Sequence, residues 1–331
     1  IEMNRFAVEE NDLIISCSGT VGMVSLIQKN DPKGIISQAL LLLRVNPKIV
    51  DPVFLNYFFK SQEGYNSIIS RSSGSVQVNI SKRETIESIP IPLPPIDVQK
   101  KIAAILSALD EKIATNRAIN DNLQQQAAAL FSSLYDRSNT EVRFTDLIQI
   151  LGGGTPKTGE NTYWNGNIAF FTPKDVGTPY TLITEKTISK EGLSHCNSRL
   201  YPVNTVFVTA RGTVGKVGMS GVPMAMNQSC YALVGKETHQ LLVYFYTLKA
   251  VDRLKHKASG AVFDAITTRD FESEQIMKLS DDDATAFLRV AEPMFQEVLN
   301  NNIENLRLST LRDSLLPKLM SGEIDVSAVQ L

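Results

Sequence analysis

The chain has 331 residues, 43% of them hydrophobic and 21% charged, as in ordinary soluble proteins, and it is long enough for two domains with separate cores. Its formal net charge of −2 shows no strong attraction to nucleic acid, and no apolar run is long enough to span a membrane. Its three cysteines have no CxxC spacing, which argues against a disulfide framework and favours a reducing compartment, so we expect a cytoplasmic protein.

Residues 1–96 have the pattern of a first domain built on short strands. ENDLIISCSGTVG (10–22) places a polar start before an apolar strand and a glycine turn. ISQALLLL (36–43), FLNYFF (54–59) and SSGSVQVNISKRE (72–84) follow in that order.

Residues 97–138 are predicted to form a long helix. Four prolines at 90, 92, 94 and 95 give an extended lead-in, Asp97 is the expected N-cap, and about 40 residues without Gly or Pro follow. Their apolar residues recur with the heptad spacing of a coiled coil.

Residues 139–280 repeat the blocks of the first domain. Four blocks match those of the first domain in the same order: PVNTVFVTARGTVG (202–215), MNQSCYAL (226–233), LVYFYT (242–247) and ASGAVFDAITTRD (258–270). The GTVG copies end at 22 and 215, and such ordered blocks indicate a duplication. The second copy has a much longer opening, so we expect that roughly 50 residues of the first copy are missing, by truncation or disorder.

Residues 281–322 are predicted to form a second long helix, with a tail at 323–331. Pro293 is expected to kink or restart this helix, and Gly322 to end it. Both helices carry two asparagines in the middle of their heptad seam, so an antiparallel pair would set Asn116 opposite Asn305 and Asn120 opposite Asn301. The alternative is that these asparagines point to solvent.

These segments resemble the specificity subunits of type I restriction-modification systems. GGGTPKTGENTYWNGNIAFFTPKDV (152–176) is similar to the opening of their target-recognition domain, and ARGTVGKVG (210–218), NQSCYAL (227–233) and SGAVFDAITTRDFE (259–272) to its later blocks. Residues 91–131 resemble the family's first conserved helix, whereas the second helix lacks the proline-rich lead-in. The resemblance implies an α+β fold of two similar recognition domains, each a mixed sheet with helices, joined by two long antiparallel coiled-coil helices with pseudo-two-fold symmetry.

The resemblance also implies a non-catalytic subunit that reads a bipartite site in double-stranded DNA, one half-site per domain. The helix pair would act as a spacer and dock two methyltransferase subunits, and restriction subunits would complete the complex. S-adenosylmethionine and ATP would be bound by those partners, with no cofactor on this chain. The competing interpretation is a duplicated protein-interaction scaffold that binds no DNA.

The residues themselves show no catalytic pattern. GxGxxG is missing, ARGTVGKV differs from a P-loop at Ala210 and Val217, and the three histidines have no metal-ligand spacing. Asp281–Asp283 could bind a metal, but they lie at the start of a predicted helix, where acidic side chains are favoured by the helix dipole, and this second interpretation is the better one.

Loop residues are the candidates for DNA contact. Residues 141–280 carry 15 Lys and Arg against 12 Asp and Glu, so this domain is modestly basic. Its candidates are Lys157, Thr158, Lys174, Arg211, Thr213, Lys216, Asn227, Gln228, Lys255 and Lys257, with the cations on phosphates and the polar side chains at base edges. The candidates in the first domain are Ser18, Thr20, Gln38, Ser73 and Ser75. Alternatively, Asn227 caps a strand, Tyr163 and Trp164 belong to a core, and the glycines only form turns.

Overall fold

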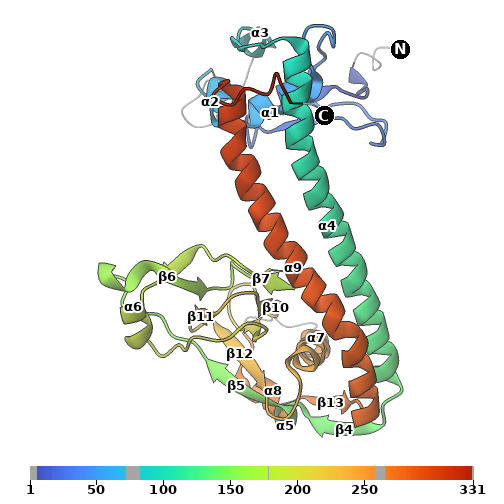
Figure 1. Ribbon diagram of the computed structural model, residues 1–331. Coiled ribbons are helices and arrows are strands. Elements are labelled where there is room, and N and C mark those ends of the chain that lie inside the picture. Colours follow the sequence, from blue (N-terminus) through green and yellow to red (C-terminus); the bar gives the residue numbers. More distant parts are fainter. Residues whose placement is uncertain (1–5, 72–82, 178, 258–264, 330–331) are drawn as a thin grey trace. The chain divides into compact units, whose positions relative to one another are not determined.

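The computed structural model describes residues 6–71, 83–177, 179–257 and 265–329 (Figure 1). They form two compact units, one made of residues 1–115 with 305–331 and the other of residues 116–304. The two long helices, α4 (Ile96–Asp136) and α9 (Asp281–Met320), each contribute a segment to both units. We call these units 1 and 2. The domain boundaries expected from the sequence stay a prediction.

Unit 1 is a small sheet covered by helices. Its elements are β1 (Leu13–Ser16), β2 (Val24–Leu26), β3 (Leu40–Leu43), α1 (Pro52–Lys60), α2 (Gln62–Ile69) and α3 (Arg83–Glu87), with the antiparallel strand order β2-β1-β3. Asp51 and Ser61 cap α1 and α2 by accepting hydrogen bonds from backbone amides of the first turn. The core joins Leu13 and Phe58 to Leu106 of α4 and Leu319 of α9, so segments far apart in sequence close it.

Unit 2 contains three sheets. Its strands are β4 (Thr140–Arg143), β5 (Ile148–Gly152), β6 (Trp164–Phe171), β7 (Tyr180–Thr181), β8 (Lys186–Ile188), β9 (Val206–Thr209), β10 (Val217–Ser220), β11 (Met224–Met226), β12 (Cys230–Gly235) and β13 (Gln275–Lys278). Its other helices are α5 (Phe144–Leu147), α6 (Lys190–Ser194), α7 (Gln240–Lys257) and α8 (Thr268–Ser273), with a 3-10 turn at Asn161–Tyr163. The strand orders are β5-β12-β9-β10-β7, β11-β6-β8 and β13-β4.

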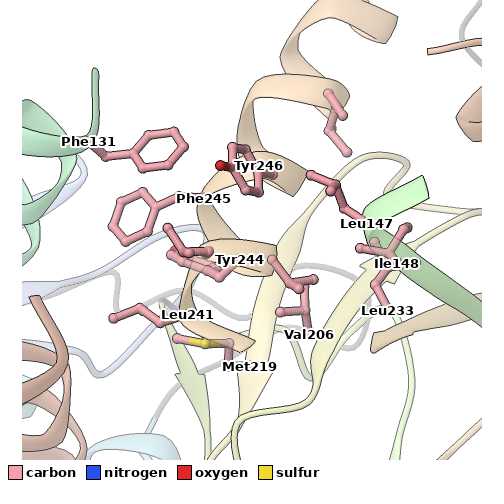
Figure 2. Close-up of a cluster of buried hydrophobic side chains, with 14 of the residues drawn as sticks. Phe131, Leu147, Ile148, Val206, Met219, Leu233, Leu241, Tyr244, Phe245 and Tyr246 are labelled. Carbon is pink, nitrogen blue, oxygen red and sulfur yellow. The ribbon is translucent and has the colours of Figure 1, made fainter. Parts of the chain in front are cut away.

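The core of unit 2 lies around α7, between the five-stranded sheet and the segments of α4 and α9 (Figures 1 and 2). Phe131 of α4 stacks on Phe245 of α7 with 5.0 Å between ring centroids, and Phe287 of α9 meets both rings edge-on. Val206 and Leu233 cover the sheet side of the same cluster. Aromatic rings therefore hold α7 against the segments of α4 and α9, while aliphatic side chains pack it against the sheet.

The duplication is visible in backbone geometry. Strands β1 and β2 pair as β9 and β10 do, and the turns that precede them contain Asn11 and Asn204 at φ angles of 70° and 69°. The Asn11 amide donates to the Ile27 carbonyl at 3.0 Å, and the Asn204 amide to that of Ser220 at 2.8 Å. An asparagine with positive φ is uncommon, so its occurrence at equivalent positions supports the predicted repeat.

Segments of α4 and α9 run antiparallel in each unit. In unit 2, Asn301 donates to Asn120 at 2.9 Å, which confirms that predicted pair and excludes the solvent-facing alternative for it. Asn116 donates to Glu304 at 2.7 Å, and its expected pairing with Asn305 stays a prediction. Buried asparagines that hydrogen-bond across a helix contact fix the register of the two helices.

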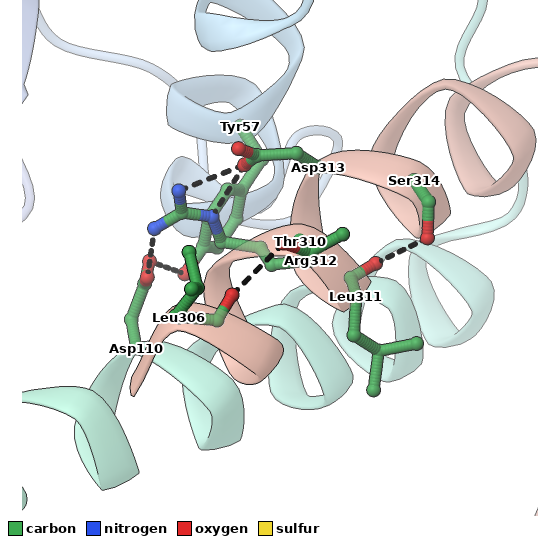
Figure 3. A network of polar contacts seen from close by, with 8 residues as sticks. All are labelled: Tyr57, Asp110, Leu306, Thr310, Leu311, Arg312, Asp313 and Ser314. Carbon is green, nitrogen blue, oxygen red and sulfur yellow. Dashed lines mark hydrogen bonds and ion pairs between the residues drawn. The ribbon is translucent and has the colours of Figure 1, made fainter. Parts of the chain in front are cut away.

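A polar network occupies the helix contact in unit 1 (Figure 3). Arg312 of α9 binds Asp110 of α4 at 2.6 Å, and the Tyr57 hydroxyl of α1 donates to the same carboxylate at 2.7 Å. Burial and then the hydrogen bond to Asp110 raise the pKa of Tyr57, so its hydroxyl remains a donor at neutral pH.

Two expectations about the long helices were wrong. Helix α9 does not restart at Pro293, which is exposed, while Ala291 and Phe295 beside it are buried and hold the helix by packing; the expected kink stays a prediction. Helix α4 begins at Ile96, so Asp97 lies in its first turn and is not the cap. Gly322 does follow the end of α9, with a φ of +75°.

Candidate nucleic-acid interface

The GTVG turn has the same construction in both copies. Gly212 and Gly215 have φ angles of 81° and 73°, and Gly19 and Gly22 have 74° and 85°. Side chains with a Cβ rarely adopt such values, so glycine is required at both positions of each turn. The Thr209 hydroxyl donates to the Thr213 carbonyl across the turn and accepts from the Lys216 amide at 2.9 Å.

Ser16 repeats this role in the first copy. Its hydroxyl donates to the Thr20 carbonyl and accepts from the Met23 amide at 2.9 Å. The side chains that flank the two turns are therefore presented from equivalent backbone positions, which pairs Arg211 with Ser18 and Lys216 with Met23.

One cavity of about 440 Å³ in unit 2 gathers several of the predicted DNA contacts. Four candidates from three loops line it: Lys174, Arg211, Thr213 and Asn227. Strand pairing explains this, because Phe171 at the end of β6 pairs with Met226 at the end of β11, and Thr209 at the end of β9 pairs with Cys230 at the start of β12. The loops that leave these strand ends consequently meet at one edge.

The cavity lining is rich in cations. Lys174 and Arg211 contribute, together with Lys186, which lies over the Trp164 ring at 5.7 Å from its centroid. Among the described residues of the lining Glu185 is the one carboxylate, and it lies 3.7 Å from the Lys174 ammonium group in an exposed pair. An exposed pair is worth little, so both partners can reorganise around an anionic ligand.

Asn227 and Ser229 give the cavity a polar wall. The Asn227 side-chain oxygen accepts from the Ser229 amide at 3.0 Å, which confirms that Asn227 caps the β11–β12 turn. Among the described residues no acceptor is recorded for its Nδ2 group, which leaves two donors for a ligand. The two interpretations of Asn227, structural cap and base contact, are therefore compatible.

The other candidates in the second domain fall outside this cavity. Lys157, Thr158 and Gln228 are exposed, and the Gln228 amide oxygen accepts from Thr155. Lys255 lies against Gly215, and the exposed Lys216 follows Gly215 in the chain. Lys257 binds the fully buried Glu274, which Arg253 also contacts at 2.7 Å, so its charge is neutralised within the fold.

The first-domain candidates are less defined. Ser18, Thr20 and Gln38 are exposed in unit 1, whereas Ser73 and Ser75 lie outside the described residues.

Sequence reasoning missed Thr172, Lys186 and Ser229 in the cavity wall. Lys186 reaches the cavity wall because β8 pairs antiparallel with β6, and no local sequence pattern predicts that pairing. Tyr163 and Trp164, expected as possible core residues, are half-buried: Tyr163 stacks on His195, and Trp164 donates to the Lys157 carbonyl.

Other chemistry finds no support in this unit. Burial raises the pKa of the Cys230 thiol to about 12, so this thiol stays protonated at neutral pH. Within the described ranges no cluster of three His, Cys, Asp or Glu side chains could hold a metal ion, and Asp283 instead binds Arg137 at 2.6 Å. No helix there is long and apolar enough to cross a bilayer.

Comparison with known proteins decides the family. The model of the type I restriction modification DNA specificity domain matches residues 2–125 and 137–278. The chain belongs to this family. It is 24% identical over 374 aligned residues to the type I restriction enzyme HindI specificity subunit of Haemophilus influenzae, covering 88% of this chain and 81% of that one.

Two further similarities extend the match. The specificity subunit of type I restriction enzyme EcoR124I/EcoR124II from Escherichia coli is 29% identical over 173 residues, covering 48% of this chain and 43% of that one. The solved S subunit of a type I restriction-modification system from M. genitalium has a TM-score of 0.63 at 18% identity, covering 96% of this chain and 84% of that one. The fold is therefore that of the specificity subunits, with two recognition domains and a pair of long helices.

Proposed function

We propose that this specificity subunit reads a bipartite site in double-stranded DNA, with one half-site for each recognition domain. The observation that carries this proposal is the cavity where three loops bring together Lys174, Arg211, Thr213 and Asn227. Arg211 offers a bidentate donor suited to guanine, and Asn227 an amide suited to adenine. The lysines of the cavity supply positive charge for the phosphates of the DNA backbone beside these bases.

In this proposal the domains are residues 1–96 and 139–280, and the helices 97–138 and 281–322 set the spacing of the half-sites and dock two methyltransferase subunits. The chain itself is non-catalytic, and it works in the cytoplasm with those subunits and with restriction subunits. The partners supply the S-adenosylmethionine and ATP chemistry, including removal of the target base from the helix stack.

The alternative, a scaffold that binds no DNA, gives no reason for a family match to a DNA specificity domain or for a cation-lined cavity in the second domain.

Methylome sequencing of cells that carry the intact gene tests the proposal directly. A methylated bipartite motif that disappears on deletion of this gene alone is the expected result. Purified chain, free of partners, should neither methylate nor cleave DNA in the presence of S-adenosylmethionine and ATP. Turnover by the chain alone, or an unchanged methylome after deletion, contradicts the proposed role.

A further inference from the structure

The GTVG turn in unit 2 carries, besides the side chains of the cavity, a second set of groups suited to an anion. The amides of Gly215 and Lys216 are used internally, by the carbonyl and hydroxyl of Thr209. For the amides of Gly212, Thr213 and Val214, no acceptor is recorded in the part of the chain that the structure describes. Successive amides of a glycine turn are a common way to bind phosphate oxygens.

Two lysines stand beside this turn. A Cβ added to Gly215 would lie 2.5 Å from Cε and 3.3 Å from Nζ of Lys255, so the α7 lysine lies directly against the turn. Lys216 follows Gly215 in sequence and is exposed, as Lys255 is. Neither ammonium group has a carboxylate recorded within 4.0 Å among the described residues, in contrast to Lys174 and Lys257.

The first copy presents the same turn with different chemistry. Met23 replaces Lys216, and a Cβ on Gly22 would lie 3.2 Å from Tyr65 and 3.2 Å from Ile69, which are four residues apart on α2 as Val251 and Lys255 are on α7. Ile69 therefore corresponds to Lys255. Met23 is 60% exposed and Ile69 is half-buried, so an uncharged, apolar surface stands where the second copy has two cations.

We propose that the turn at residues 212–216, together with Lys216 and Lys255, is a binding site for DNA backbone phosphate, present in the second domain and lacking its cations in the first. This inference rests on the proposed function, because it assigns backbone contact to a domain that reads DNA. A lysine that neutralises a phosphate releases a counterion, whereas Met23 and Ile69, the residues at the equivalent positions of the first copy, release none. The second half-site therefore accounts for more of the salt dependence of binding than the first.

The salt dependence of DNA affinity tests the site without knowledge of the recognised sequence. The full chain, assembled with its methyltransferase subunits, is titrated with a short mixed-sequence duplex across a salt series. Lys216→Met and Lys255→Met should each flatten the slope of log affinity against log salt by about 0.9 unit, and the double variant by about twice that. Unchanged thermal unfolding shows that the turn still folds.

The reciprocal change provides a matched control. Met23→Lys places a cation on the same backbone position of the first copy and should steepen the slope by about 0.9 unit. If Lys216→Met and Lys255→Met leave the slope of a binding-competent complex unchanged, the phosphate site is wrong while the proposed function stands. If the wild-type complex binds no duplex, the proposed function itself fails.

Free phosphate is the other source of the same ligand chemistry. Inorganic phosphate is therefore added to the purified chain while the amide resonances of Gly212 and Thr213 are followed by NMR. Duplex DNA should shift these resonances at concentrations where inorganic phosphate does not. The inference would be overturned if inorganic phosphate alone shifted these resonances and the lysine variants left the slope of log affinity against log salt unchanged. The turn would then be a site for a small anion.

Discussion

Asp12 is a buried carboxylate that the first copy satisfies with an ion pair. Burial alone would raise the pKa of Asp12. Two hydrogen bonds from Arg44 at 2.7 Å, a hydrogen bond from the backbone amide of Glu9 and the positive charge of Arg44 outweigh that effect, so the pKa is lowered. The second copy has Thr205 and Val234 at the corresponding positions, and the Thr205 hydroxyl donates to the Pro202 carbonyl at 2.8 Å. The same backbone position therefore accommodates either a buried ion pair or uncharged side chains.

Arg44→Val is expected to lower the free energy of unfolding at neutral pH by about 1–3 kcal/mol, because it leaves the Asp12 carboxylate buried without its main donor. Asp12→Thr combined with Arg44→Val copies the second domain and should recover most of that loss. Urea denaturation of the three proteins measures the effect. Equal losses in the single and double variants would contradict this explanation.

The same pair predicts a pH dependence. A carboxylate whose pKa is lowered by folding contributes stability above its unfolded pKa of about 4, and that contribution disappears as pH falls through the folded pKa. The wild-type protein should therefore lose its advantage over Arg44→Val in acid.

Arg211 and Asn227 are expected to carry base recognition at the cavity. Alanine at either position should cost about 1–3 kcal/mol in affinity for the cognate second half-site and little for a scrambled one. The comparison requires the assembled complex and the motif from methylome sequencing. Lys257→Met is the matched control: it should destabilise the fold by removing one of the two cations that pair with buried Glu274, while cognate affinity of the folded complex is retained.

At the scale of elements, the sequence was informative where the signal is local. The repeated strand-and-turn blocks predicted the duplication, and heptad spacing predicted the long helices, because both patterns lie within single segments. The cavity was not predictable as a site, because it depends on β6 pairing with both β8 and β11 across loops of different length. The expected restart of the helix at Pro293 was wrong for the same reason: packing by Phe287 and Phe295 keeps α9 helical despite local propensity.

The Asn120–Asn301 pair provides an element-scale prediction. Asn301→Leu alone should destabilise unit 2 by about 1–3 kcal/mol, because the buried Asn120 oxygen loses its donor. Asn120→Leu with Asn301→Leu should be at least as stable as the wild type but less specific in register. Denaturation of a double-mutant cycle measures the coupling, and strictly additive effects would show that the two amides do not act as a pair.

At the scale of the whole molecule, the two copies are expected to act as separate readers. Replacing residues 139–280 by the corresponding segment of another family member should change one half of the methylated motif and leave the other half and the spacing intact. Methylome sequencing of the exchanged strain checks this. A change in both halves would show that each domain contributes to both half-sites.

Unit 1 is built from two segments that are far apart in the sequence, and this has a consequence for biosynthesis. Unit 2 comes from one continuous stretch, residues 116–304, whereas the core of unit 1 needs Leu319, Met320 and Val326 beside Leu13. Domains usually fold in the order in which the ribosome releases them. Here we expect the order to be reversed, with the earlier-made residues of unit 1 waiting for the last helical turns of α9 while unit 2 closes its core first. Truncation within α9 would therefore leave the first-made segment exposed to chaperones and proteases.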